Sequence, residues 1–402
     1  MKLLEGVKVL DLSRVLAGPW CTQALADLGA EVTKVEQPGV GDDTRHWGPP
    51  WLTHGDQKVA AYFLSAKRGK RSVAIDFSRP EGADLVRRMA AGADVVVENF
   101  RLGGLKKFGL DAATLRAINP RLVYASITGF GQDGPHAARA GYDYIIQGMG
   151  GLMSLTGHAD GTPGAGPMRA GVAVADLFTG MYASQAILAA LVRRGVTGEG
   201  ATIDLALFDT QLAVLANQAS NAMVSGRDPG RQGAGHPNIV PYQPFDASDQ
   251  PIIIAVGNDR QFAKLAELLG RSEWVGDPDY ATNSARVANR ARLVPMIEAI
   301  VRAEPAAKWL ELLEEAGIPA GPINSVSQAL ADPQAVERGM RRLLDGGALG
   351  PVPVVGSPVR IDGARADADL PPPGLGEHSR AVIEPLIGAE AFEKLRDAGV
   401  VS

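Results

Sequence analysis

Apolar and polar positions in the first half of the chain alternate between two periods. Short apolar runs with the length and composition of buried strands occupy residues 7–12, 31–36, 72–76, 94–98 and 122–127. Stretches with helical character separate these runs, and the clearest of them covers residues 80–91. Strands that alternate with helices predict a parallel, doubly wound sheet, so we expect an α/β fold of the Rossmann type.

The longest helical pattern starts next to Asp176. Residues 177–194 are rich in Ala, Leu and Met, and we predict that the helix stops at Gly195, after two arginines. An acid in the first turn of a helix faces unpaired amides and the positive end of the dipole, which favour its ionised form. An ionised carboxylate is a nucleophile, but an acid at this place is more often a helix cap. Position alone therefore favours the cap and leaves the nucleophile open.

The second half of the chain has a different organisation. A strand at 201–208 and a helix at 209–223 precede a stretch rich in Gly and Pro at 225–238, which indicates a linker or a mobile loop. A buried strand at 251–256 and several amphipathic helices follow, and a tail rich in Pro and Gly starts near residue 326. We therefore predict boundaries that divide the chain into a large domain at 1–224, a small domain at 225–325 and a C-terminal segment at 326–402.

Composition narrows the possible functions. The chain has 402 residues, of which 46% are hydrophobic and 21% charged, so it is long enough to bury a large core. Its net charge of -5 argues against a general nucleic-acid binder, which would be basic. The single cysteine, Cys21, forms no internal disulfide and suits a reducing compartment. Because we find no secretory leader and no apolar run as long as a membrane span, we predict a cytoplasmic protein without membrane contact.

Several common catalytic motifs do not occur. The sequence contains neither a P-loop nor the G-x-G-x-x-G fingerprint of dinucleotide binding. It also contains no H-E-x-x-H zinc motif and no G-x-S-x-G elbow of a serine hydrolase. We therefore predict no metal and no tightly bound cofactor, and an enzyme of this kind would depend on its own carboxylate.

Two basic clusters lie near the expected strand ends. Residues 67–71 read Lys-Arg-Gly-Lys-Arg, and a second pair, Lys106 and Lys107, follows Gly103-Gly104. Each cluster is either a solvated charge run or a phosphate site, since Lys and Arg bind phosphates through charge-assisted hydrogen bonds. Polar stretches also follow three of the expected strands, at 11–19, 36–39 and 98–101, and ligands collect at the carboxyl ends of such strands. Two phosphate sites on one rim would suit a ligand such as coenzyme A.

A set of motifs in a fixed order resembles one known family. The matching stretches are 6–12 (GVKVLDL), 17–19 (AGP), 28–36 (LGAEVTKVE), 41–45 (GDDTR), 70–72 (KRS), 97–100 (VENF), 141–143 (GYD) and 174–176 (VAD). Further matches reach residue 323, so the resemblance covers nearly the whole chain. Together these stretches resemble the class III CoA-transferases, the family of formyl-CoA transferase, carnitine CoA-transferase and α-methylacyl-CoA racemase.

The resemblance implies an architecture and a set of site residues. It implies a large Rossmann-like domain to which the C-terminal segment returns, with an inserted smaller α+β domain, and a homodimer of two interlocked, ring-like chains. The catalytic aspartate of the family falls on Asp176. The substrate pocket is expected to contain Tyr142, Asp143, Trp47, Tyr62, Gly233 and Gly235. The expected CoA contacts are Arg14, Val15, Lys70, Asn99, Phe100, Gly104 and Lys107.

Some residues of this chain differ from the motifs of particular family members, and these differences favour some of the family's activities over others. Gln37 and Leu16 replace an arginine and a glutamine of formyl-CoA transferase, which argues against formyl transfer. The racemases carry Gly-His-Asp where this chain has Gly141-Tyr142-Asp143. A tyrosine, with a reference pKa of about 10, is a poor base at neutral pH, so transfer is favoured over racemisation. Arg169 and Arg260 are candidates for holding the second carboxylate of a dicarboxylic acid, or else for surface ion pairs.

The function implied by the resemblance is CoA transfer. CoA moves from an acyl-CoA, such as succinyl-CoA or a similar short dicarboxylic thioester, to a carboxylic acid through an aspartyl anhydride and an enzyme-CoA thioester. CoA and acyl-CoA are then substrates rather than bound cofactors. Two alternatives stay open at this point. One is an α-methylacyl-CoA racemase that exchanges the α-proton, and the other is a non-catalytic acyl-CoA binding protein.

Overall fold

Contacts within the chain divide it into two compact units. The computed structural model describes residues 2–402. The first unit contains residues up to Leu152, then Ala170–Ser220 and Pro333–Ser402, and the second contains Met153–Arg169 and Asn221–Asp332. Met153–Arg169 thus groups with the second unit, although the sequence analysis assigned it to the large domain. Whether the units are the domains predicted at 1–224, 225–325 and 326–402 stays a prediction.

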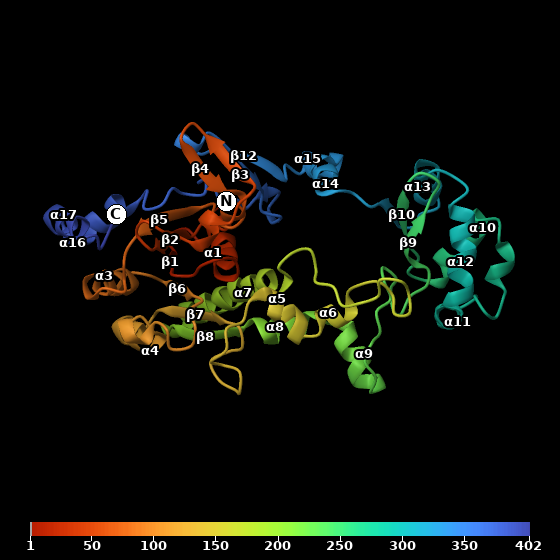
Figure 1. The fold of residues 1–402 in the computed structure, drawn as a ribbon, viewed down its shortest axis with the longest axis horizontal. Helices are drawn as coiled ribbons and strands as arrows, with labels where there is room; N and C mark the ends of the chain where they lie inside the picture. The colour runs from red at the N-terminus through yellow and green to blue at the C-terminus, as the bar shows by residue number, and fades with distance from the viewer. Residues whose placement is uncertain (1) are drawn as a thin grey trace. The chain divides into compact units, whose positions relative to one another are not determined.

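The first unit is built on a six-stranded sheet in which every pairing is parallel. This confirms the predicted α/β fold. The strands are β1 (Lys8–Asp11), β2 (Glu31–Glu36), β5 (Lys70–Ala74), β6 (Val95–Glu98), β7 (Val123–Thr128) and β8 (Ala201–Ala206). Their order across the sheet is β5-β2-β1-β6-β7-β8 (Figure 1). This is the Rossmann order, which reverses between β1 and β6.

Both faces of the sheet are buried, which explains the unbroken apolar runs of its strands. One core contains Val9 and Val97 together with residues of α1 (Ala17–Asp27) and α7 (Val174–Thr197). The other core contains Leu10 and Val96, whose side chains point to the opposite face. Helices that contribute to this second core are α3 (Pro80–Ala91), α4 (Ala112–Ile118), α16 (Ser379–Ile387) and α17 (Ala389–Asp397).

The remaining elements of the first unit are short. They are α2 (Ala61–Leu64), α5 (Asp143–Met149), α8 (Leu207–Val214), α15 (Pro333–Glu337), and the paired strands β3 (Trp51–His54) with β4 (Gln57–Ala60), β12 (Arg341–Asp345) with β13 (Pro351–Val355), and β14 (Arg360–Ile361) with β15 (Ala364–Arg365). The C-terminal segment pairs with the sheet edge, because His378 N–H donates to Ser72 O and Ser402 N–H donates to Ala74 O.

The second unit has its own sheet and core. Its strands β9 (Tyr242–Asp246), β10 (Pro251–Ala255) and β11 (Ala320–Pro322) pair antiparallel. The helices are α10 (Asp259–Leu268), α11 (Asn283–Ala288), α12 (Arg290–Val301), α13 (Ala306–Glu315) and α14 (Val326–Ala331). Buried Ile252 and Ile254 of β10 pack with Phe262 and Leu265 of α10, as the amphipathic pattern predicted. Helices α6 (Leu152–Leu155) and α9 (Asn217–Ser225) lie where the chain passes between units.

Two helix boundaries differ from the prediction. The helix expected at 209–223 is broken into α8 and α9, because Ala216 adopts a left-handed conformation with φ of 47°. Helix α7 runs past the expected stop at Gly195 and ends at Gly198, whose φ is 76° and whose N–H bonds to Arg194 O. A glycine stops a helix only where its backbone turns left-handed, which the sequence does not show.

Helix α7 passes a length and composition test for a membrane span, although the sequence analysis expected no such segment. In the first unit, however, α7 places Ala175, Ala183 and Ile187 in the core beside α1. A core helix of a globular unit satisfies the same test.

Gly180 allows α7 to approach α1 closely. A Cβ atom at Gly180 would lie 2.6 Å from the carbonyl oxygen of Ala17, the first residue of α1. This contact is one turn away from Asp176, so it fixes that carboxylate relative to the start of α1. Any larger residue at position 180 has to push the two helices apart.

We expect Gly180→Ala to destabilise the protein by about 1–3 kcal/mol, because the added methyl group overpacks the contact between α7 and α1. Gly195→Ala is the matched control in the same helix, since a Cβ there has no neighbour within 4 Å. It should stabilise by roughly 0.5–1 kcal/mol through helix propensity. Urea unfolding of both variants measures the difference, and equal effects would contradict the close approach.

Candidate active site

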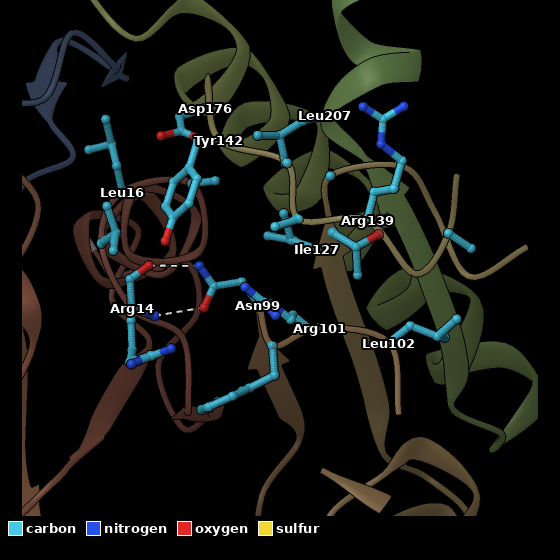
Figure 2. A pocket seen from close by; sticks show the side chains of 18 of the residues that line it. Arg14, Leu16, Asn99, Arg101, Leu102, Ile127, Arg139, Tyr142, Asp176 and Leu207 are labelled. Carbon is cyan, nitrogen blue, oxygen red and sulfur yellow. Dashed lines mark hydrogen bonds between the residues drawn. The ribbon is translucent and has the colours of Figure 1, made fainter. Parts of the chain in front are cut away.

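A pocket opens where the strand order reverses, outside the carboxyl ends of β1 and β6. Most of its lining comes from the turns after β1, β6 and β7 and from the first turn of α7, with Asp43 from the segment after β2 and Leu207 from the start of α8, all within the first unit (Figure 2). The lining residues are Arg14, Val15, Leu16, Ala17, Asp43, Asn99, Phe100, Arg101, Leu102, Ile127, Thr128, Gly129, Ala137, Arg139, Ala140, Gly141, Tyr142, Asp176 and Leu207. Ligands of doubly wound sheets bind at this place, since two neighbouring turns diverge there.

The turns after β1 and β6 are locked together by reciprocal hydrogen bonds. Arg14 N–H donates to Asn99 Oδ1 at 2.8 Å, and Asn99 Nδ2 donates to Arg14 O at 2.7 Å. The Arg14 guanidinium lies 5.1 Å from the centre of the Phe100 ring and 3.4 Å from Asp43 Oδ2. The structure thus brings four predicted CoA contacts, Arg14, Val15, Asn99 and Phe100, into one pocket with Asp176.

Asp143, not Asp176, caps the long helix α7. Its Oδ1 accepts hydrogen bonds from the N–H groups of Ala175 at 2.8 Å and Asp176 at 3.4 Å. Its Oδ2 accepts a bond from Gln147 Nε2 at 2.7 Å, which fixes the carboxylate. Within the described chain, the Asp176 carboxylate has neither a hydrogen-bond donor nor a cation as partner. The interpretation of Asp176 as a helix cap is therefore wrong, and its side chain is available in the pocket.

The electrostatic surroundings of Asp176 favour its neutral form. Burial, followed by the negative charge of Asp143, raises the pKa of Asp176 to about 7. This corrects the expectation that the helix end keeps this acid ionised. Because the amides at the start of α7 already bond to Asp143, they do little for the Asp176 carboxylate. A carboxyl that titrates near neutral pH inside a pocket is typical of functional sites.

Of the three predicted aromatic residues, Tyr142 lines the pocket of Asp176, whereas Trp47 and Tyr62 are not among its lining residues. Tyr142 lines the pocket and is exposed, and Figure 2 shows its ring between Asp176 and Arg14. Trp47 and Tyr62 contact each other edge to face with ring centres 5.2 Å apart. Burial, followed by the charges of Asp176 and Asp143, raises the pKa of Tyr62 to about 12. Tyr62 therefore lies within electrostatic reach of Asp176, and Trp47 is positioned through Tyr62.

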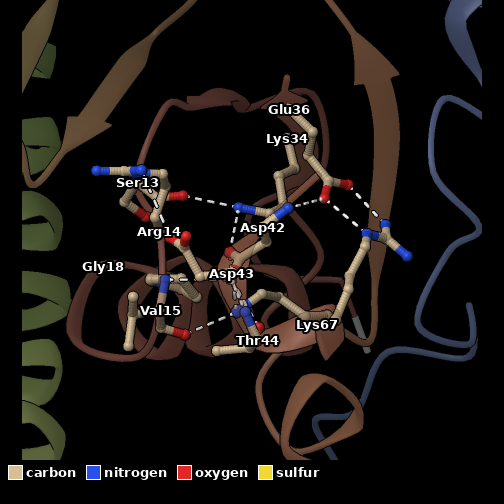
Figure 3. A network of polar contacts seen from close by, with 12 residues as sticks. Ser13, Arg14, Val15, Gly18, Lys34, Glu36, Asp42, Asp43, Thr44 and Lys67 are labelled. Carbon is tan, nitrogen blue, oxygen red and sulfur yellow. Dashed lines mark hydrogen bonds and ion pairs between the residues drawn. The ribbon is translucent and has the colours of Figure 1, made fainter. Parts of the chain in front are cut away.

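The first basic cluster is mostly interior, which corrects both of its interpretations, as a solvated charge run and as a phosphate site. Lys70 is buried, and its Nζ donates to Asp11 Oδ2, Pro19 O and Thr22 Oγ1. Lys67 is buried beneath the pocket-lining turn (Figure 3). Arg68 is buried against Asp27. Lys70 was predicted to bind CoA, but its ammonium does not reach the pocket because neighbouring acceptors surround it.

Other predicted residues lie apart from this pocket. Gly104 and Lys107 follow the lining residues Arg101 and Leu102 in the sequence, but neither of them lines the pocket. The Nζ atom of Lys107 lies over the Phe108 ring. Gly233 and Gly235 belong to the second unit, as do Arg169 and Arg260, so their predicted roles stay predictions.

The structure adds two cationic residues that the sequence analysis did not select. Arg101 and Arg139 both line the pocket. Arg101 ends the polar stretch 98–101, whose place after a strand was the available signal. Arg139 lies in the long connection between β7 and α5, where no local pattern marks it.

Replacing Asp176 with Asn is expected to stabilise the protein more at pH 8 than at pH 5. Because the pKa of Asp176 is higher in the folded protein than in the unfolded chain, protonation of this carboxyl favours folding. This contribution to stability is fully present below pH 3.8, the ordinary pKa of an aspartate, and is lost as the pH rises through about 7. Each pKa unit corresponds to roughly 1.4 kcal/mol. With partial solvent access, the change between pH 5 and 8 should be about 2 kcal/mol.

Urea unfolding of the wild type and Asp176→Asn at several pH values measures this change. Asp133→Asn, at an exposed position, controls for the loss of one negative charge. A pH dependence of the same size in the control would contradict the assignment to Asp176.

Comparison with known proteins gives a consistent result over the full length. The model of CoA-transferase family III matches residues 4–379. Succinate–glutarate CoA-transferase of Agrobacterium fabrum is 49% identical over 385 residues, 95% of this chain and 95% of that protein. Succinyl-CoA:glutarate CoA-transferase of Mus musculus is 43% identical over 403 residues, 100% of this chain and 91% of that protein.

A solved structure agrees with the fold as well. The crystal structure of a CAIB/BAIF family protein from Brucella suis matches with a TM-score of 0.83 and 52% identity, covering 95% of this chain and 99% of that one. The resemblance seen in the sequence motifs is thereby confirmed. The chain belongs to CoA-transferase family III and is an enzyme that acts as a CoA-transferase.

Proposed function

We propose that the enzyme moves CoA from succinyl-CoA to a dicarboxylic acid such as glutarate, with Asp176 as the group that carries the intermediate. The observation that supports this most is the Asp176 carboxylate itself, which has no partner in the described chain and lies in the pocket at the strand reversal. The donor and acceptor come from the names of the relatives, which match this chain over 95% or more of its length.

The reaction is an exchange of one acid for another. An Asp176 oxygen attacks the thioester carbonyl of the donor, the C–S bond breaks, and CoA leaves as a thiolate, which gives a mixed anhydride. The thiolate then attacks the aspartyl carbonyl of the anhydride, the C–O bond to the donor acid breaks, and this acid leaves as a carboxylate, which gives an aspartyl-CoA thioester. The acceptor carboxylate repeats these steps in reverse. Splitting the exchange in this way is the use of covalent catalysis, and it consumes no nucleotide.

The residues around Asp176 suit a CoA thioester. Arg14 and Asn99 form the floor of the pocket where the strand order reverses, and Arg101 and Arg139 add cations for phosphate groups. Tyr142 lines the pocket and would shape the acyl end of the site, and Tyr62, whose pKa is raised by burial and by the charge of Asp176, is a further candidate together with its neighbour Trp47. The Gly-rich stretch with Gly233 and Gly235 is a candidate to cover the intermediate and to donate backbone N–H groups.

A single incubation tests this proposal against the alternatives. With succinyl-CoA and glutarate, we expect glutaryl-CoA and succinate, identified by mass spectrometry. Borohydride or hydroxylamine trapping should mark Asp176, and Asp176→Asn should reduce transfer by more than about 10³-fold, as for other removed nucleophiles. The acylation rate should rise as the pH increases through about 7, because only the ionised carboxyl attacks.

Asp143→Asn is the matched comparison. It removes the neighbouring charge but keeps an oxygen that accepts from Ala175 N–H, so the label at Asp176 should persist while the pH profile moves to lower pH. Full transfer by Asp176→Asn would refute the mechanism. Exchange of the α-proton with solvent, without transfer, would instead support a racemase, and unchanged bound thioester would support a binding protein.

We also propose that the enzyme is a homodimer of interlocked chains. In the first unit, Phe178, Met181 and Tyr182 of α7 and Ile145 of α5 are 42–48% exposed. Such a group of large apolar side chains is typical of an interface between proteins. The apolar face and the family resemblance support the dimer, and the threading rests on the resemblance alone.

Light scattering should give twice the chain mass of 42.1 kDa. Met181→Glu should shift the protein toward monomer or aggregate, because it places a charge in the apolar face. Leu386→Glu on α16, at a similar exposure of 46%, should leave the mass unchanged. If the chains are threaded, strong dilution will not dissociate the dimer, and a monomer at all concentrations would contradict the proposal.

A further inference from the structure

The pocket-lining turn after β1 contains an unusual backbone conformation. Val15 has φ of 67°, in the left-handed region that a β-branched residue rarely adopts. Val15, Leu16 and Ala17 all line the pocket together with Asp176. Strained residues of this kind persist only where the surrounding structure holds them, and they concentrate at functional sites.

Side chains from other elements hold three successive residues of this turn. Lys34 Nζ donates to Ser13 O at 2.7 Å, and Asn99 bonds to both backbone groups of Arg14. Val15 itself is held from both sides. Its N–H donates to Asp42 Oδ1 at 3.3 Å, and its carbonyl accepts from Lys67 Nζ at 2.8 Å (Figure 3).

Burying the Lys67 ammonium in this position costs free energy, because the charge loses its contact with water. Its side chain is fully buried, beside the Phe63 ring, and its one acidic contact is Asp42 Oδ2 at 3.4 Å. Lys34 lies closer to the same carboxylate oxygen, at 2.9 Å, so charge pairing alone does not require Lys67. Burial lowers the pKa of Lys67 to about 7, with Lys34, Lys70, Asp42 and Asp11 as the charged groups around it. A neutral amine still donates to the Val15 carbonyl, so its hydrogen bond survives deprotonation.

The turn leads directly into helix α1. Leu16 is the N-cap residue and makes no side-chain cap, and no described group accepts from the N–H of Leu16 or Ala17. These amides belong to residues that line the pocket of Asp176. Attack of the Asp176 carboxylate on a thioester turns the carbonyl oxygen into an oxyanion, which backbone N–H donors stabilise.

We propose that Lys67 is a positioning residue for CoA transfer: its bond to the Val15 carbonyl holds the left-handed turn, which sets the N–H groups of Leu16 and Ala17 for the oxyanion. The inference rests on the proposed role of Asp176. Lys67 touches neither substrate nor reacting atoms, and it acts through the conformation of Val15.

A rescue experiment separates positioning from general stability. Lys67→Met keeps the apolar stem and removes the donor, and it should lower kcat by roughly 10- to 100-fold with little change in KM. Val15→Gly removes the Cβ that makes the left-handed conformation costly. In the Val15→Gly background, Lys67→Met should therefore lower kcat by less than about threefold, because the two sites are coupled.

Lys70→Met is the matched control, since Lys70 is also buried but bonds to Asp11, Pro19 and Thr22, and within the described chain it has no hydrogen bond or ion pair with Val15 or Asp42. Its effect on kcat should be the same in both backgrounds. Equal losses for Lys67→Met in both backgrounds, or a wild-type kcat, would overturn the proposal. If Lys67→Met does not fold, Lys67→Leu provides the same comparison, because it also removes the donor.

Hydrogen–deuterium exchange of a peptide covering residues 12–20 gives a readout that needs no substrate. Lys67→Met should accelerate exchange of the turn, and unchanged exchange would overturn the proposal. If the wild type transfers no CoA and Asp176 is never labelled, the proposed function fails, and the exchange data still show whether Lys67 holds the turn.

Discussion

The reversal of strand order between β1 and β6 is the constraint on which the site depends. It makes the turns after these two strands diverge, and the reciprocal hydrogen bonds between Arg14 and Asn99 join them again at the floor of the opening. Helix α7 is brought to the same edge by its close contact with the first turn of α1 at Gly180. Parallel pairing and one helix contact thus place residues 14, 99 and 176 together, although they are far apart in the sequence.

The electrostatics of the site follow from how two carboxylates share one helix end. The Asp143 carboxylate accepts hydrogen bonds from the N–H groups at the start of α7, and, in addition to burial, its negative charge raises the pKa of Asp176. Within the described chain, no hydrogen-bond donor or cation contacts the Asp176 carboxylate to offset this charge. Asp176 thus stays in a half-buried place where ionisation costs free energy. That cost supports the nucleophilic role that we propose for Asp176, because a poorly solvated carboxylate gains more from forming a bond.

Much of this arrangement follows from sequence pattern, and the rest depends on backbone detail. The alternation of strands and helices predicted the parallel sheet, and the motifs predicted that Arg14, Val15, Asn99 and Phe100 would share a site with Asp176. Lys70, which the resemblance placed among the CoA contacts, is buried against Asp11, and a motif does not show which of its side chains turn inward. The stop of α7 was misplaced because Gly198, and not the predicted Gly195, turns left-handed. Asp143, and not Asp176, caps α7 through a contact between residues 33 positions apart, and no local pattern in the sequence encodes such a contact.

The cap that Asp143 provides has a consequence for the stability of helix α7 when Asp176 is chemically modified. Because the start of α7 takes its acceptor from a neighbouring helix, esterifying or neutralising Asp176 removes no hydrogen bond from the framework. The hydrogen bonds of the scaffold are thus independent of the chemical state of Asp176, the group that we propose to react. We therefore expect the start of α7 to keep its hydrogen bonds when Asp176 is covalently modified, so that the modified side chain has the same backbone support as the unmodified one.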